Sequence, residues 1–217
     1  MLSGGLDSAT VLAMAQAQNY ELYALTVEYG QRHSREIHCA RAQAKTRQVA
    51  QHKVVRLELP DIRASALTDT ALLPRAQPAS QIPPTYVPAR NTILLSLALS
   101  WAESLGAVDI FIGATAVDYS GYPDCRAAFI EAFEKLANLA TRAAVQDGKK
   151  FRIHAPLLDL PKHKIIERGR ELGVDFAMTS SCYDPDQQGR ACGQCDACAL
   201  RLKGFQQADL LDPVRYA

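Results

Sequence analysis

The stretch Ser3-Gly4-Gly5-Leu6-Asp7-Ser8 lies at the start of the chain and leads directly into Ala9-Thr10-Val11-Leu12, a run typical of a helix. A glycine-rich loop at a helix N-terminus can bind phosphate, because its glycines let backbone N–H groups approach an anion and the helix adds unpaired donors and its dipole. The spacing matches neither GxxxxGK(S/T) nor GxGxxG. A serine-capped helix after a tight turn would explain these residues equally well. The rest of the chain decides between the two interpretations.

The chain has 217 residues and a formal net charge of +1. Its length fits one domain, with or without a small appendage. The near-neutral charge favours small-molecule chemistry over a nucleic-acid or membrane surface. No secretory signal is visible, and the densest apolar run, Ile93 to Ala102, is far too short to span a bilayer. We therefore expect a cytoplasmic protein without nucleic-acid or membrane partners.

Hydrophobic periodicity divides the chain into alternating strands and helices. Expected strands are 21–28, 54–59, 108–113 and 151–155. Expected helices are 7–18, 34–51, 89–105, one that follows a loop at 114–124, and 162–172, the last being the final core helix. Helix 89–105 is apolar on nearly every face, which predicts that it is buried. In the next helix the expected buried stripe consists of Phe129, Phe133, Leu136 and Ala140. Residues 60–88 are expected to form a long loop, a feature that often carries function.

This alternation predicts the fold class α/β, with a parallel sheet that is covered by helices on both faces. In such sheets ligands bind beyond the C-terminal ends of the strands. Polar clusters lie where strands give way to loops or helices, at 3–8, 29–33, 88–91, 115–126 and 156–162. We expect these clusters to meet at one edge of the sheet and to form a single site.

Four of the six cysteines, Cys182, Cys192, Cys195 and Cys198, crowd near the C-terminus, whereas Cys39 and Cys125 are isolated. In a reducing compartment such clustering favours a metal over disulfides. Four thiolates suit a closed, structural tetrahedral Zn²⁺ site, and an iron–sulfur cluster is the alternative. The expected organisation is therefore an α/β nucleotide-binding domain, 1–178, followed by a metal-binding segment and tail, 179–217.

Residues 3–8 match the SGGxDS signature of the PP-loop ATP pyrophosphatases, which cleave ATP between the α and β phosphates. Three further segments complete a resemblance to one branch of that superfamily, the 7-cyano-7-deazaguanine synthases of queuosine biosynthesis. They are Glu28-Tyr29-Gly30-Gln31-Arg32-His33, Val87-Pro88-Ala89-Arg90-Asn91 and Asp118-Tyr119-Ser120-Gly121-Tyr122-Pro123-Asp124-Cys125-Arg126. The resemblance includes the four cysteines, runs from Leu2 to about Lys203, and implies an adenine nucleotide alpha hydrolase-like, Rossmann-like fold. In one departure, family members usually carry a first apolar strand before the loop, where this chain has only Met1 and Leu2.

The resemblance implies an ATP-dependent carbon–nitrogen ligase that acts as a homodimer. It would convert 7-carboxy-7-deazaguanine and ammonia to 7-cyano-7-deazaguanine through an adenylated carboxylate and an amide, with ATP as substrate, Mg²⁺ as its companion and zinc at the cysteines. The alternative enzyme is a PP-loop tRNA-modifying enzyme of the thiolation or lysidine type. A different class is a zinc-binding interaction protein that binds ATP without turning it over.

The resemblance also implies roles for the residues around the loop. Nucleotide binding is expected from Leu2, Ser3, Gly4, Gly5, Leu6, Asp7, Ser8, Ala9, Thr10, Val11 and Leu12. Asp7 is expected to be a Mg²⁺ ligand, because a carboxylate would repel phosphate directly. Lys162 is expected near the pyrophosphate, and the Arg90 guanidinium suits a phosphate or a carboxylate. The simpler alternatives are a helix N-terminal carboxylate, a solvated lysine and a surface arginine.

The segment 118–126 is the expected site for the deazaguanine. Its candidate residues are Asp118, Ser120, Gly121, Tyr122, Asp124 and Arg126. A carboxylate of Asp118 or Asp124 can accept from the donor edge of a purine-like base, and Tyr122 can stack on the ring. Arg126 is expected to face the substrate carboxylate. A surface turn is the simpler alternative for the whole segment.

Overall fold

The computed structural model describes residues 1–29, 35–57, 65, 82, 85–117 and 122–217, and the statements below concern these residues. Three expectations fall wholly or largely outside them. They concern the segment containing Arg32 and His33, the loop 60–88, and the substrate residues Asp118, Ser120 and Gly121.

The described strands form two parallel pairs. β1 (Tyr23–Glu28) pairs with β2 (Gln51–Arg56), and β3 (Asp109–Phe111) pairs with β4 (Arg152–His154). The first two residues of the chain lie between the pairs. The Leu2 N–H donates to the Leu25 carbonyl at 2.8 Å, and the Met1 amino group donates to the Phe111 carbonyl at 2.8 Å. Met1 and Leu2 therefore link the two pairs into one layer.

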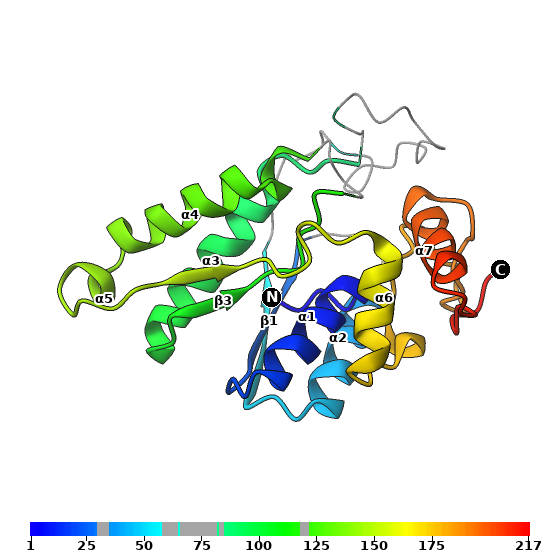
Figure 1. The fold of residues 1–217 in the computed structure, drawn as a ribbon, viewed down its shortest axis with the longest axis horizontal. Helices are drawn as coiled ribbons and strands as arrows, with labels where there is room; N and C mark the ends of the chain where they lie inside the picture. Colours follow the sequence, from blue (N-terminus) through cyan, green and yellow to red (C-terminus); the bar gives the residue numbers. More distant parts are fainter. Residues whose placement is uncertain (30–34, 58–64, 66–81, 83–84, 118–121) are drawn as a thin grey trace.

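Helices cover both faces of this layer. They are α1 (Leu6–Ala17), α2 (Arg35–Thr46), α3 (Arg90–Leu105), α4 (Ala127–Ala140), the single turn α5 (Arg142–Val145), α6 (Lys162–Glu171) and α7 (Asp196–Gln207), with short 3₁₀ turns at Pro123–Cys125 and Phe176–Met178. In Figure 1, α3 and α4 lie on one side of the strands, α1, α2 and α6 lie on the other, and α7 lies outside α6. The predicted α/β fold with a parallel arrangement of strands is confirmed.

The alternation of side chains along each strand explains the two covered faces. Leu25 and Val27 of β1 belong to the core under α3 and α4, whereas Ala24 faces the opposite way and packs with Ala40 and Ala44 of α2. Successive strand residues point to opposite faces, so a strand that is buried on both sides needs residues at every position that are apolar or, like Thr26, hydrogen-bonded. The burial of β1 over four consecutive residues is the expected result.

Two helix predictions are wrong in detail. α2 ends at Thr46 and not near residue 51, because Gln48 adopts a left-handed φ of 51° and Gln51 already pairs with Tyr23 in the sheet. In α4 the buried stripe consists of Ile130, Phe133 and Ala137. Leu136, expected in that stripe, is 50% exposed.

The prediction that the helix beginning at Lys162 is the last core helix is also wrong. α7 follows it within the cysteine-containing segment, and Phe205 of α7 packs in one cluster with Ile165 and Ile166 of α6. α6 and α7 can lie this close together because residue 204 is a glycine. A Cβ at that position would lie 2.5 Å from the Lys162 side chain. The C-terminal segment is therefore packed onto the α/β core through α7. No helix among the described residues is long and apolar enough to cross a membrane.

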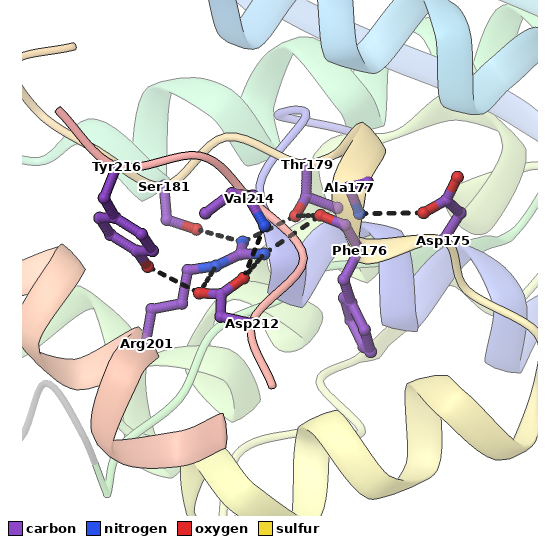
Figure 2. A network of polar contacts seen from close by, with 9 residues as sticks. All are labelled: Asp175, Phe176, Ala177, Thr179, Ser181, Arg201, Asp212, Val214 and Tyr216. Carbon is purple, nitrogen blue, oxygen red and sulfur yellow. Dashed lines mark hydrogen bonds and ion pairs between the residues drawn. The ribbon is translucent and has the colours of Figure 1, made fainter. Parts of the chain in front are cut away.

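A buried ion pair fastens α7 to the segments around it. Arg201 Nε donates to Asp212 Oδ2 at 2.7 Å, and both side chains are 4% exposed. The same guanidinium donates to the Thr179 hydroxyl at 2.7 Å and to the Phe176 carbonyl at 3.1 Å, while the Tyr216 hydroxyl donates to Asp212 at 2.6 Å (Figure 2). The network joins α7, the C-terminal tail and the segment 176–181, and its charges have the partners that burial requires.

Candidate active site

The loop 3–8 is held rigidly in a conformation that glycine alone permits. Gly4 has φ +91°, and a Cβ there would lie 2.0 Å from the backbone oxygen of Glu36. Its carbonyl accepts from the Ser180 N–H and from Gln43 Nε2, both at 3.0 Å. The residue that precedes α1 is Gly5, and no side chain caps that helix within the described residues. The serine-capped helix is thus not what forms, and N–H groups at the start of α1 stay available to an anion.

The loop borders a cavity of about 260 Å³. The cavity is lined from several of the predicted polar clusters, including Ser3, Asp7 and Ser8 of the loop, Tyr29 after β1, Arg90 and Asn91 of α3, Thr115 and Tyr122 after β3, and Lys162 of α6. Residues 180–183, which precede the cysteine cluster, complete one wall. The structure therefore brings together, at the C-terminal ends of the strands, segments from both ends of the chain.

Asp7 and Lys162 form an ion pair beside the loop. Lys162 Nζ lies 2.8 and 3.0 Å from the two carboxylate oxygens of Asp7. Lys162 is 7% exposed, so it is not the solvated surface lysine of the simpler interpretation. The pair places one anion and one cation at the N-terminus of α1, where a metal-bound polyphosphate would find a ligand for the metal and a partner for an oxygen.

Arg90 enters the same cavity from the start of α3. Its Nη1 donates to the Tyr29 hydroxyl at 3.3 Å, and its guanidinium carbon lies 6.0 Å from the centre of that ring. Burial disfavours its charge, but Tyr29, Tyr122 and Tyr183 outweigh that effect, so the pKa of Arg90 is raised and the group stays cationic. Arg90 is thus a half-buried cation that lines the cavity and not a solvated surface arginine.

The expected substrate segment divides into residues that face the cavity and residues that do not. Tyr122 lines the cavity, with its hydroxyl 2.6 Å from the Thr85 hydroxyl. Asp124 is 6% exposed, and its carboxylate accepts from the Asn91 N–H at 2.9 Å, so it braces the start of α3. Arg126 is exposed at the start of α4 and is not among the described residues that line the cavity.

The residues expected to bind nucleotide divide in the same way. Leu2, Ser3, Gly5, Leu6, Asp7 and Ser8 line the cavity. Ala9, Thr10, Val11 and Leu12 lie inside α1, outside the described lining; Val11 packs in the core, and the Thr10 hydroxyl donates to the Leu6 carbonyl at 3.1 Å. These four residues therefore belong to the helix that carries the loop and not to the wall of the cavity.

Thr115 and Glu36 are polar residues of the cavity to which sequence reasoning gave no individual role, although Thr115 lies in the predicted cluster 115–126. Thr115 is 2% exposed, and its hydroxyl has no hydrogen-bond partner among the described residues. Glu36, in the first turn of α2, also lines the cavity, and burial raises its pKa to about 7 against an opposing effect of Arg90. The available signal was position, since Glu36 lies three residues after the polar segment 29–33, at the start of a predicted helix.

The four clustered cysteines converge in space. Their sulfur atoms all lie within 4.8 Å of one another. The Cys182 sulfur accepts from the Cys192 N–H at 3.2 Å and from the Asp184 N–H at 3.3 Å, as expected for a thiolate. Gly189 and Gly193 adopt φ +77° and +71° in the turns between them. Four sulfur donors at this separation fit a metal with tetrahedral thiolate coordination.

Comparison with known proteins gives a consistent result. The family model of queuosine biosynthesis protein QueC matches residues 1–209. The chain is similar to the 7-cyano-7-deazaguanine synthase of Stutzerimonas stutzeri strain A1501, with 58% identity over 216 residues that cover 100% of this chain and 96% of that protein. It is equally similar, at 58% over 217 residues and the same coverage, to the 7-cyano-7-deazaguanine synthase of Thiobacillus denitrificans strain ATCC 25259 / T1.

Similarity to solved structures is weaker. The NMN synthetase from Francisella tularensis aligns with 97% of this chain and 76% of its own, at 14% identity and a TM-score of 0.49. The U34-tRNA thiolase NcsA from Methanococcus maripaludis, solved with its [4Fe-4S] cluster, aligns with 97% of this chain and 71% of its own, at 15% identity and a TM-score of 0.46. These scores are too low to support an argument about function.

Proposed function

The chain belongs to the queuosine biosynthesis protein QueC family, and we propose that it converts 7-carboxy-7-deazaguanine, ammonia and ATP to 7-cyano-7-deazaguanine. The observation that carries the proposal is the convergence of the loop 3–8, the Asp7–Lys162 pair and Arg90 on one cavity at the end of the strands. That arrangement suits a triphosphate and a second, anionic substrate in one site.

The chemistry explains why phosphate binding is the main task of the protein. A carboxylate is a poor electrophile, because its charge repels an amine and oxide is a poor leaving group. Transfer of AMP from ATP gives an acyl adenylate that ammonia can attack, and a second AMP transfer to the amide oxygen leads to the nitrile. Each transfer needs stabilisation of charge on the departing pyrophosphate more than it needs a protein nucleophile.

Different residues of the cavity have different roles in this reaction. The N–H groups of the loop and the hydroxyls of Ser3 and Ser8 bind the β and γ phosphates. Lys162 neutralises the departing pyrophosphate, and Asp7 would hold Mg²⁺, which would supply further stabilisation of the charge. Arg90 receives the substrate carboxylate, a role that falls to it because Arg126 lies outside the described cavity lining. Tyr122 stacks on the deazaguanine, with Asp118, Ser120 and Gly121 as further candidates in the same segment.

The cysteine cluster holds a structural zinc ion in this proposal. Three of the four sulfurs are buried, and a closed four-thiolate site leaves no position for chemistry. Metal analysis of the purified protein should find about one zinc per chain. Iron together with visible absorbance would instead indicate the iron–sulfur alternative.

We further propose a cytoplasmic homodimer that acts without nucleic acid. Leu136, Leu139 and Val145 are 50%, 80% and 67% exposed on α4 and α5, which is consistent with a protein contact on that side. The net charge of +1 argues against the tRNA-modifying alternative. Sedimentation would test the dimer, and incubation with ATP and tRNA would test the alternative.

The deciding experiment is mass spectrometry of the products formed from ATP, Mg²⁺, ammonium and 7-carboxy-7-deazaguanine. We expect the nitrile, with the amide as an intermediate and AMP and pyrophosphate as co-products. Absence of both amide and nitrile would refute the assignment. An Asp7→Asn variant should fold and lose pyrophosphate release, and normal turnover by that variant would refute the metal role of Asp7.

A further inference from the structure

Glu36 is a carboxylate of the cavity that the scheme above leaves unused. It lies in the first turn of α2, is half-buried, and belongs to the lining of the cavity. No hydrogen bond from another described residue reaches its carboxylate. Burial raises the pKa of Glu36 to about 7, and Arg90 acts in the opposite direction.

We propose that Glu36 is the proton acceptor for the reacting nitrogen, an inference that rests on the function proposed above. Ammonia and the amide both carry protons that must leave as the reaction advances. A base is most effective when its proton affinity is tuned near the working pH, as burial does for this carboxylate. Glu36 would therefore act in both halves of the reaction.

The proton balance defines each step. In the first half, ammonia forms a C–N bond to the acyl carbon, the C–O bond to AMP breaks with its electron pair on AMP, and one N–H proton passes to Glu36. In the second half, the amide oxygen displaces pyrophosphate from ATP and one N–H proton is lost. The C–O bond then breaks, AMP leaves with that oxygen, and the last N–H proton is taken up as the C≡N bond forms. Glu36 returns each proton to solvent between steps.

The other candidate bases in the described cavity are already committed. Asp7 is paired with Lys162 at 2.8 Å, next to the phosphate loop. The thiol of Cys125 accepts from Asn91 Nδ2 at 3.3 Å, and burial together with Asp124 raises its pKa to about 11. No histidine lines the cavity among the described residues. Glu36 is the carboxylate left beside Arg90, which receives the carboxylate that reacts.

The backbone fixes Glu36 relative to the phosphates. Its carbonyl oxygen lies against Gly4, where an added Cβ would come within 2.0 Å. The first turn of α2 and the phosphate loop are therefore in direct contact. A substrate adenylated at that loop would be presented to a base on the adjoining turn, which is the pre-positioning that proton transfer requires.

The test separates activation from nitrogen chemistry. Exchange of labelled pyrophosphate into ATP, measured with 7-carboxy-7-deazaguanine and no ammonium, reports adenylation alone. Amide and nitrile formation with ammonium reports the steps that release protons. For Glu36→Gln we expect exchange within about threefold of the native protein and a loss of amide and nitrile formation of about 100-fold or more. A Glu36→Asp variant, which keeps a carboxylate, should retain more amide formation than Glu36→Gln.

The control is Glu131→Gln, which removes the same charge from an exposed position on α4 and should change neither assay. Equal loss of exchange and amide formation in Glu36→Gln would show that Glu36 binds metal or nucleotide, and unchanged amide formation would show that another group takes the proton. Either result overturns the proposal, and Glu36→Asp gives the answer if the glutamine variant does not fold. If the native protein forms neither amide nor nitrile, the reaction itself is wrong and the role of Glu36 falls with it.

Discussion

The phosphate loop is supported from two sides, and the supports differ in kind. On the sheet side, Leu2 binds β1 twice, through its N–H to the Leu25 carbonyl and through its carbonyl to the Thr26 hydroxyl, and the Met1 amino group donates to the Phe111 carbonyl of β3. On the C-terminal side, Ser180 binds the Gly4 carbonyl, and a buried, fully paired arginine network fastens the segment 176–181 to α7. The support that is remote in sequence is the more extensive one, so the loop should be more sensitive to damage in the C-terminal segment than in the sheet.

Of the changes proposed here, metal removal should destabilise the C-terminal support of the loop the most. The cysteine cluster contributes Cys195 and Cys198 to the start of α7, the helix that carries Arg201. Structural zinc sites supply much of the folding free energy of the segments they hold, on the order of 10 kcal/mol in small domains. A strong chelator should therefore abolish hydrogen-exchange protection over 182–217 first, and over the loop 3–8 next.

The control region is β2, which pairs with β1 and contributes no residue to the packed cluster around the four cysteines or to the cluster that contains Phe205 of α7. It should therefore keep its protection. Uniform loss of protection over the whole chain would mean that the metal stabilises the domain globally and not the loop through α7. Unchanged protection of 3–8 after metal release would mean that the two regions are independent.

Arg201→Met should have the next largest effect. It leaves Asp212 charged at 4% exposure, and within the described part of the chain its remaining partners are the Tyr216 hydroxyl and the Val214 N–H. Removing one member of a buried ion pair costs about 3–5 kcal/mol, because the remaining charge is uncompensated. The free energy of unfolding from denaturant titration measures the cost.

Arg168→Met provides the control, since Arg168 pairs with Glu171 on an exposed helix face and should cost less than about 1 kcal/mol. The double variant Arg201→Met with Asp212→Leu should recover part of the lost stability, because an apolar pair can replace a buried ion pair. A cost for Arg201→Met no larger than that of Arg168→Met would remove the contrast between the two supports.

Gly4→Ala tests the loop itself. The substitution forces a side chain into a left-handed conformation and against the Glu36 carbonyl, where it would lie at 2.0 Å. We expect a loss of about 2–3 kcal/mol and loss of pyrophosphate release, since strain of this type costs about 1–3 kcal/mol and the neighbouring backbone must also move.

Gly148→Ala separates the cost of the left-handed backbone conformation from the cost of the contact with the Glu36 carbonyl. Gly148 has φ +67° and nothing within 4 Å of an added Cβ, so it should show the conformational cost alone, about 1 kcal/mol. Equal costs at the two positions would show that the contact with α2 is easily relieved.

The sequence predicts the two supports unequally well, for physical reasons. The loop and the cysteine cluster carry short-range signals, because glycine spacing and thiol spacing follow directly from the anion or metal to be held. The position of Glu36 and the braces from Asp124 and Arg201 depend on contacts over long sequence separations, which a local pattern does not contain. α7 was missed because its buried face includes Arg201 and Gly204, which a hydrophobic pattern does not mark, and because Gly204 is what lets α7 approach α6 closely.

Thr26→Val should have the smallest effect and tests the sheet-side support. The Thr26 hydroxyl, 1% exposed, donates to the Leu2 carbonyl at 2.6 Å and lies 2.8 Å from His52 Nε2. Valine has the same shape, so the variant removes these hydrogen bonds with little change in packing, and we expect a loss of about 1 kcal/mol. If the loop depends mainly on its C-terminal support, pyrophosphate release should fall less than twofold. A loss of release as large as that of Arg201→Met would mean that the two-residue link through Leu2 holds the loop as firmly as the arginine network does, and the comparison would have to be reversed.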